Sequence, residues 1–154
     1  MKYEFNEGKN IYGDLIFESK FWKLFLAPSQ RYLGTSVLVL KREAKNLRDL
    51  TPREWKEFSL IVKDSELAMN RSFNPDLYNW ACFKNAAYRD ESGEVKAKVH
   101  WHIHPRYKDP VIFEELKFID PDFGYPPRLG KKTIPDELRE KIIKHLRKAI
   151  VQLY

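Results

Sequence analysis

The stretch "KVHWHIHPRYKDP", from Lys98 to Pro110, holds three of the four histidines in this chain of 154 residues. His100, His102 and His104 are spaced two apart, and residues at that spacing on a β-strand point to the same face. The stretch therefore predicts a strand with a polar row, in which Lys98 precedes the histidines. The opposite face is apolar and carries Val99, Trp101 and Ile103.

Three interpretations of the histidine row are open from the residues alone. The row can be the polar face of a half-buried strand. It can be a zinc site, since imidazole is a common metal ligand, but positions about 6.5–7 Å apart on a straight strand let two histidines share an ion more readily than three. The chain has no HExxH motif and no pair of cysteines to complete such a site. The third interpretation is a histidine nucleophile that attacks phosphorus.

The composition indicates one ordinary globular domain. Hydrophobic residues make up 43% of the chain and aromatic residues 14%, which is enough to form one core. The net charge of +6 favours an anionic partner. Basic and acidic residues are interleaved, however, and no RNA-recognition or helix-turn-helix pattern occurs, so we do not expect nucleic acid as the partner.

The chain carries no signal for a membrane or for export. No apolar run approaches the roughly 20 residues of a membrane span, and the N-terminal residues lack the apolar region of a signal peptide. Cys82 is the single cysteine, so no disulfide can form within the chain, and we interpret it as a small core residue. We expect a cytoplasmic protein without a membrane partner.

Alternating and short apolar runs predict five strands. They lie at 12–19, 20–28, 35–42, 77–83 and 96–104. Helical spacing of apolar residues predicts two main helices, at 52–73 and 133–154. Thr51 and Glu54 form a capping box before the first helix, with Pro52 at its first position.

This order predicts an α+β fold built on an antiparallel sheet of about five strands. We expect a single domain over residues 1–154, with a core at about 11–110. Residues 111–154 form a C-terminal arm and helix, and the proline-rich part before the helix is expected to be extended, with little regular structure.

The stretch "VHWHIHPRY" resembles the histidine triad family of nucleotide hydrolases and transferases, in particular a branch with the form LHWHIIPRY. The family signature is HxHxH followed by two apolar residues and often Pro-Arg. Residues 34–42, "GTSVLVLKR", are similar to the family's GHxLVxPKR strand, and residues 49–55, "DLTPREW", are similar to DLTxEE. The resemblance covers roughly residues 11–110 and implies a histidine triad-like fold.

The match favours an offset register for the triad. Pro105 follows His104 directly, so anchoring on Pro105 and Arg106 puts Lys98 first, His100 in the middle and His102 third. The family often has Gly-Gln beginning seven residues before its middle histidine, and Gly93-Glu94 begins seven residues before His100. The resemblance therefore implies that His100 is the nucleophile, with His102 as the rival.

The resemblance also implies roles for neighbouring residues. The main-chain carbonyl of His102 would orient the His100 ring while its side chain contacts phosphate, and Lys98 and Arg106 would stabilise phosphate charge. His104 is either a further wall of the phosphate pocket or an exposed polar residue. Phe17, Phe25 and Leu26 are candidates for the base pocket or for the core. The expected nucleotide-binding set is Lys98, His104, Asn85, Gly93, Glu94, Thr35 and Arg106.

The implied activity is nucleotidyl transfer at the α-phosphate of dinucleoside polyphosphates or nucleoside phosphoramidates, through a covalent nucleotidyl-histidine intermediate. No cofactor is required and no protein metal site is expected, although a divalent cation can accompany a polyphosphate substrate. The resemblance implies a homodimer. Lys98, Thr35, Glu94 and Val95 depart from the family pattern, so the alternative is a nucleotide-binding module with weak or no turnover.

Overall fold

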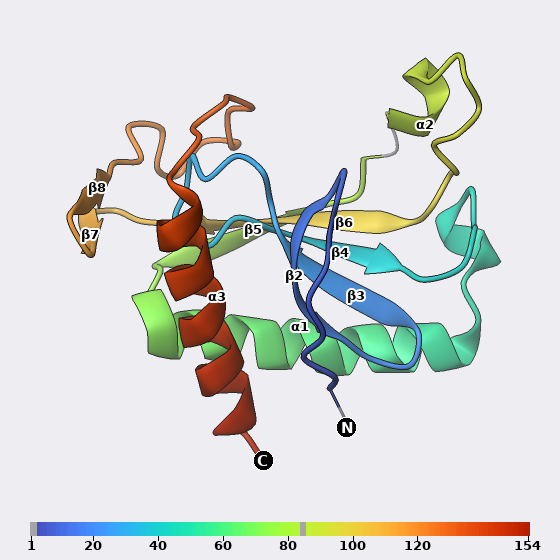
Figure 1. The fold of residues 1–154 in the computed structure, drawn as a ribbon, viewed down its shortest axis with the longest axis horizontal. Coiled ribbons are helices and arrows are strands. Elements are labelled where there is room, and N and C mark those ends of the chain that lie inside the picture. The colour runs from blue at the N-terminus through green and yellow to red at the C-terminus, as the bar shows by residue number, and fades with distance from the viewer. Residues whose placement is uncertain (1–2, 84–85) are drawn as a thin grey trace.

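A computed structural model describes residues 3–83 and 86–154, and it arranges them around one antiparallel sheet (Figure 1). The strands are β1 Lys9–Asn10, β2 Gly13–Glu18, β3 Trp22–Leu26, β4 Ser36–Leu40, β5 Leu77–Ala81, β6 His100–Arg106, β7 Val111–Phe113 and β8 Leu116–Phe118. The helices are the 3-10 turn η1 Leu47–Asp49, then α1 Pro52–Phe73, α2 Ala86–Arg89 and α3 Asp136–Val151.

The main sheet has the strand order β1-β2-β3-β4-β6-β5, and every neighbouring pair is antiparallel. This confirms the predicted α+β class, and the five expected strands are β2 to β6. The two-residue β1 makes the sheet six-stranded. In the C-terminal arm, β7 and β8 form a hairpin where the sequence predicted little regular structure. Its turn contains Glu114 in the left-handed region, with φ at 54°.

Both long helices cover the same face of the sheet. Trp101 and Ile103 of β6 point toward α1, and the Trp101 ring lies 5.1 Å from that of Phe58. Helix α3 packs against α1 and β2 (Figure 1). Its buried positions include Leu138, Ile142, Leu146 and Ile150, as the periodicity predicted. The main core therefore lies between the helices and one side of β6, while the histidine side faces away from them.

Helix α1 begins and ends with specific caps. Thr51 and Glu54 form the predicted capping box, and Asn74 ends the helix in the left-handed conformation. Arg42 donates to the buried Glu54 carboxylate at 2.6 Å and, with the capping bonds, lowers the pKa of Glu54 to about 2. The start of α1 is thereby tied to the end of β4.

A glycine sets the hairpin that joins β1 to β2. Gly13 has a φ of 120°, and a Cβ at this position would lie 1.9 Å from the Leu26 carbonyl oxygen. Only glycine permits this approach. The turn puts Tyr12 on the histidine side of the sheet. Among the described residues, no helix is long and apolar enough to cross a membrane.

Candidate active site

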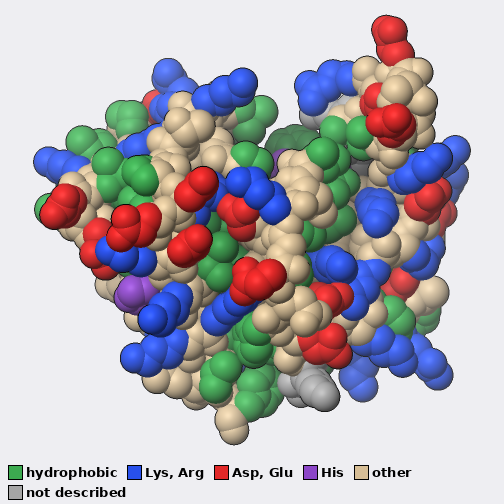
Figure 2. Space-filling model, viewed as in Figure 1, with side chains coloured by type: hydrophobic (Ala, Val, Ile, Leu, Met, Phe, Trp, Pro, Cys, Tyr) green, Lys and Arg blue, Asp and Glu red, His purple; other side chains and the backbone are tan. Residues whose placement is uncertain are grey.

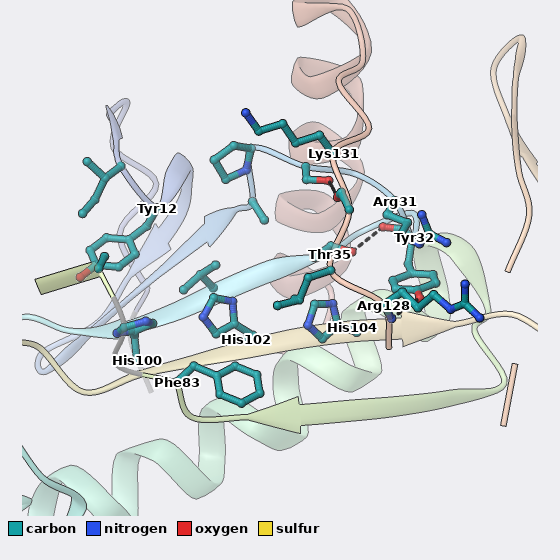
Figure 3. Close-up of a pocket in the computed structure, with 18 of the residues that line it drawn as sticks. Tyr12, Arg31, Tyr32, Thr35, Phe83, His100, His102, His104, Arg128 and Lys131 are labelled. Atoms are coloured by element: carbon teal, nitrogen blue, oxygen red, sulfur yellow. Dashed lines mark hydrogen bonds between the residues drawn. The ribbon is translucent and has the colours of Figure 1, made fainter. Parts of the chain in front are cut away.

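The three histidines of β6 form a row across the open face of the sheet (Figure 3). The ring centroids of His100 and His102 lie 5.2 Å apart, and those of His102 and His104 lie 6.2 Å apart. His100 and His104 are buried, with 7% and 6% of their surface exposed. The alternation predicted for this strand is therefore confirmed.

A cavity of about 800 Å³ lies over this row. Figure 2 shows the surface hollowed beside the projecting segment that contains α2. The cavity joins segments that are far apart in sequence: the β1–β2 turn, the loop before β4, the end of β5, and the C-terminal arm. Besides the histidines, its walls include Tyr12, Arg31, Tyr32, Phe83, Arg128 and Leu129. Nothing in the sequence identifies these wall residues, because their proximity depends on the tertiary fold.

One end of the cavity is aromatic and apolar. The Tyr12 ring lies 5.2 Å from that of His100 and 6.0 Å from that of Phe25. Phe25 belongs to a small buried cluster beneath Tyr12, together with Leu15, Ala27, Val37 and Val39. The other two candidates for a base pocket, Phe17 and Leu26, lie in the main core. Of the two alternatives left open for these residues, the core is therefore the one observed for Phe17 and Leu26.

The ring of His100 is held by a main-chain carbonyl. Its Nδ1 lies 2.8 Å from the carbonyl oxygen of Lys98, an arrangement in which Nδ1–H donates and Nε2 is left as the free lone pair. The sequence interpretation assigned this role to the carbonyl of His102, which is wrong. No hydrogen bond from residues 3–83 or 86–154 fixes the ring of His102 in this way.

Strand pairing explains why the Lys98 carbonyl is available. Directly before β6, the main-chain carbonyl of Val99 accepts from Leu40 of β4, whereas at the end of β6 the carbonyl of Arg106 accepts from Asp76 on the β5 side. Even-numbered residues of β6 therefore direct their main-chain groups toward β5. The last β5 pair is Ala81 with His102, so the carbonyl of Lys98 lies beyond the end of β5 and can bind the imidazole.

Burial keeps the histidine row uncharged. Desolvation lowers the pKa of His100 below its usual range. The pKa values of His102 and His104 fall to about 4, again mainly through desolvation. The neighbouring His100 and His104 rings lower the pKa of His102 further, and the positive charge of Arg106 lowers that of His104. All three rings are therefore neutral near pH 7, and a neutral imidazole has the lone pair that nucleophilic attack needs.

We expect His104 to make the protein sensitive to acid. Its pKa in the folded protein, about 4, lies below the ordinary value of 6.5. As the pH falls, the unfolded chain therefore takes up a proton before the folded chain does, and the free energy of unfolding decreases between pH 6.5 and about 4. His104→Gln should reduce the loss of unfolding free energy between pH 7 and pH 5, measured by urea denaturation. Arg71→Gln, an exposed change on α1 that removes no group titrating in this pH range, should leave that loss unchanged. Equal losses in both variants would contradict the assignment.

The structure brings together four of the residues predicted for the site. His100, His102, His104 and Thr35 all line the cavity. The Thr35 hydroxyl donates to the carbonyl of Tyr32 at 2.6 Å, so it supports the wall. Asn85 lies outside the described residues.

Four other predicted residues lie elsewhere. Gly93 and Glu94 are exposed in the loop before β6 and do not line the cavity. Lys98 lines a neighbouring hollow, where its ammonium donates to the carbonyl of Lys41 at 2.8 Å. Arg106 is fully buried and cannot reach a phosphate, because its guanidinium is occupied by the carboxylate of Asp120 and by other protein oxygens.

Within residues 3–83 and 86–154, no three side chains of His, Cys, Asp or Glu are placed to hold a metal ion together. The rings in the row are spread along a straight strand, and ring centroids of its neighbours are more than 5 Å apart. Such a row offers two ligands to an ion more readily than three.

Comparisons with protein-family models and with curated proteins find no match. Solved structures do match. A hypothetical histidine triad nucleotide-binding protein from Sulfolobus tokodaii has a TM-score of 0.65 at 19% identity, over 90% of this chain and 84% of that one. A histidine triad protein from Sinorhizobium meliloti has a TM-score of 0.67 at 15% identity, over 88% and 87%. A zinc-bound histidine triad family protein from Mycobacterium smegmatis has a TM-score of 0.57 at 20% identity, over 90% and 84%.

These identities are low, and the likeness lies in the arrangement of the elements. It extends over 88–90% of this chain and 84–87% of each of these three structures. This chain therefore has the fold of the histidine triad proteins.

Proposed function

We propose that this protein is a nucleotidyl hydrolase or transferase of the histidine triad family, with His100 as its nucleophile. The observation that carries the proposal is the hydrogen bond from the His100 ring to the Lys98 carbonyl, at 2.8 Å. It fixes the tautomer that leaves Nε2 unprotonated beside a cavity large enough for a nucleotide. The aromatic end around Tyr12 is suited to a base, and the histidine row to the α-phosphate.

The proposed chemistry has two steps. In the first, the Nε2 lone pair of His100 forms a bond to the α-phosphorus, and the bond from phosphorus to the leaving group breaks with its electron pair. In the second, the oxygen of water or another acceptor forms a bond to the same phosphorus, the bond from phosphorus to Nε2 breaks and returns its electron pair to His100, and the acceptor loses its proton as the nucleotide is released. His102, next along the row, faces the same cavity and is placed to contact the transferred phosphoryl group. The two steps use no group outside the protein, the substrate and the acceptor.

The proposal is tested by measuring release of AMP from adenosine phosphoramidate and from diadenosine polyphosphates. Turnover with a nucleotidyl adduct on the protein, detected by mass spectrometry after acid-free quenching, is the expected result. Binding of AMP without turnover of any of these substrates would support the alternative of a binding module. The positions of Lys98, Gly93 and Glu94 outside the cavity favour that alternative, since fewer phosphate contacts are then present than the family pattern implies.

The value of kcat/KM should decline only on the acidic side of pH 6.5. Since burial lowers the pKa of His100 below 6.5, the nucleophile stays neutral as the pH falls from 8 to 6.5. We expect kcat/KM to be flat over that range and to decline only at lower pH, where the ring becomes protonated. A profile of initial rates from pH 4 to 8 checks this. A decline that already begins above pH 7 would show that another group controls the rate.

We also propose that two chains pair through β5 into a homodimer. This strand ends the sheet, and in the described parts of the chain no strand lies along its outer edge. Free strand edges are templates for pairing. Sedimentation equilibrium should give twice the mass of one chain at micromolar concentration, and the mass of a single chain would contradict the proposal.

A further inference from the structure

The far end of the cavity, opposite Tyr12, is basic. Figure 3 shows Arg31, Tyr32 and Arg128 grouped beyond His104. Arg31 comes from the loop before β4 and Arg128 from the C-terminal arm, and both line the cavity. The Arg128 main-chain N–H donates to the Tyr32 hydroxyl at 3.1 Å. We call Arg31, Arg128 and His104 the basic end.

The arm that carries Arg128 is fixed to the rest of the fold on both sides of it. Before Arg128, the buried guanidinium of Arg106 donates to the main-chain oxygens of Asp122 and Tyr125. After it, the Ser29 hydroxyl donates to Gly130 at 2.6 Å and accepts from the N–H of Lys132 at 3.0 Å. The basic end is therefore built into the fold.

The charges at this end are not balanced. Arg31 and Arg128 approach the same carboxylate oxygen, Oδ2 of Asp122, at 3.7 and 3.1 Å. One carboxylate thus faces two guanidinium groups. The Nε–H of Arg31 is buried and has no hydrogen-bond partner among the described residues. Donors remain for a further anion, and guanidinium groups match the geometry of phosphate.

His104 provides an independent sign of a ligand. It is 6% exposed, and both of its ring nitrogens are buried without a partner in the described parts of the chain. Such a group costs free energy unless something binds it. Its ring faces the cavity between His102 and the two arginines (Figure 3), where one N–H can donate to an anionic oxygen.

We propose that the basic end binds phosphate groups of the leaving group, so that the substrate carries at least one phosphate beyond the α-phosphate. The inference rests on the proposed function and narrows it, because it selects nucleoside polyphosphates over phosphoramidates. The α-phosphate lies at His100, and the following phosphates continue past His102 toward His104, Arg31 and Arg128.

The protonation of the row agrees with this choice. An amine that leaves from phosphorus must take up a proton, whereas a phosphate leaves as a stable anion with the electron pair of the broken bond. Since His102 and His104 are neutral at pH 7, with pKa values near 4, neither is a good proton donor for an amine. Arginine and imidazole N–H groups can instead stabilise the charge on a departing phosphate.

The test compares binding of AMP and ATP by calorimetry, in EDTA at constant ionic strength, on the His100→Ala protein so that no turnover occurs. We expect ATP to bind about tenfold or more tightly than AMP, as charge-assisted hydrogen bonds imply. Adding Arg128→Gln or Arg31→Gln should remove most of this preference while leaving the affinity for AMP nearly unchanged. Adding Arg71→Gln, the same change of charge on exposed α1, should preserve it.

The outcomes separate this inference from the proposed function. If ATP binds no more tightly than AMP, or if the preference survives loss of both Arg31 and Arg128, the basic end is not a phosphate subsite, whatever the enzyme turns over. If wild type releases AMP from no substrate but the preference for ATP depends on these arginines, the subsite stands and the enzymatic proposal fails. With turnover, Arg128→Gln should lower kcat/KM for diadenosine tetraphosphate and spare adenosine phosphoramidate.

Discussion

Replacing His100 by alanine is expected to lower kcat by about 10⁴-fold or more, as loss of a nucleophile does in covalent catalysis. Within the described residues, His100 is the only histidine of the row whose ring is hydrogen-bonded to a main-chain carbonyl. Alanine removes the atom that forms the bond to phosphorus, and water cannot take its place in the same geometry. The affinity for AMP should change little, because Tyr12 and the rest of the cavity remain.

The measurement is the rate of AMP release by wild type, His100→Ala and His102→Ala at equal concentration. His102→Ala should lose less than His100→Ala, because it removes a contact and leaves the nucleophile. His145→Ala, on the exposed side of α3, is the matched control and should keep full activity. A dominant effect of His102 would mean that the triad is shifted by two residues along β6. The adduct should be absent from His100→Ala.

Replacing Arg106 by glutamine is expected to lower the free energy of unfolding by about 3–5 kcal/mol, the usual cost of breaking a buried ion pair. Arg106 and Asp120 have 0% and 1% of their side chains exposed, and Nε donates to the carboxylate at 2.6 Å. Glutamine would leave the Asp120 charge buried and the carbonyls of Asp122 and Tyr125 without their donor. The arm would then lose its attachment to the histidine strand.

Urea denaturation measures this effect as a shift of the midpoint at unchanged slope. Arg71→Gln is the matched control, and its midpoint should move little because the side chain is exposed. The double variant Arg106→Met with Asp120→Leu should recover part of the loss, since it removes both charges. A wild-type midpoint in Arg106→Gln would refute the role of this pair.

Local sequence patterns were sufficient for most of the fold. Alternation and helical spacing predicted strands β2 to β6 and helices α1 and α3, and the Thr51 capping box fixed where α1 begins. The hairpin β7–β8 was missed because its strands have three residues each, too short for a period to show. Its turn also contains Glu114 with a positive φ. Glycine or asparagine is usual at such a position, and because neither occurs there the sequence gives no signal for a turn.

The site was predictable where it depends on one strand and not where it depends on contacts between distant segments. Alternation placed the three histidines on one face, as observed. Arg106 was interpreted as a phosphate ligand because nothing in the sequence shows that Asp120, fourteen residues later, folds back onto it.

Lys98 was expected beside the histidines, but regular pairing of β6 begins at His100, and the lysine binds the carbonyl of Lys41. Tyr12 is in the cavity because Gly13 lets the hairpin close.

Parts of the two ends of the cavity come from opposite ends of the chain: Tyr12 of the aromatic end from the β1–β2 turn, and Arg128 of the basic end from the C-terminal arm. Selection or protein engineering can therefore change preference at one end without altering the strand that carries His100. A chimaera that receives a different arm would have to keep Arg106 and Asp120 as a matched pair, since β6 and the arm each supply one partner. An exchanged arm would also have to keep the bonds that join it to Ser29 and Tyr32, because these hold Arg128 at the basic end.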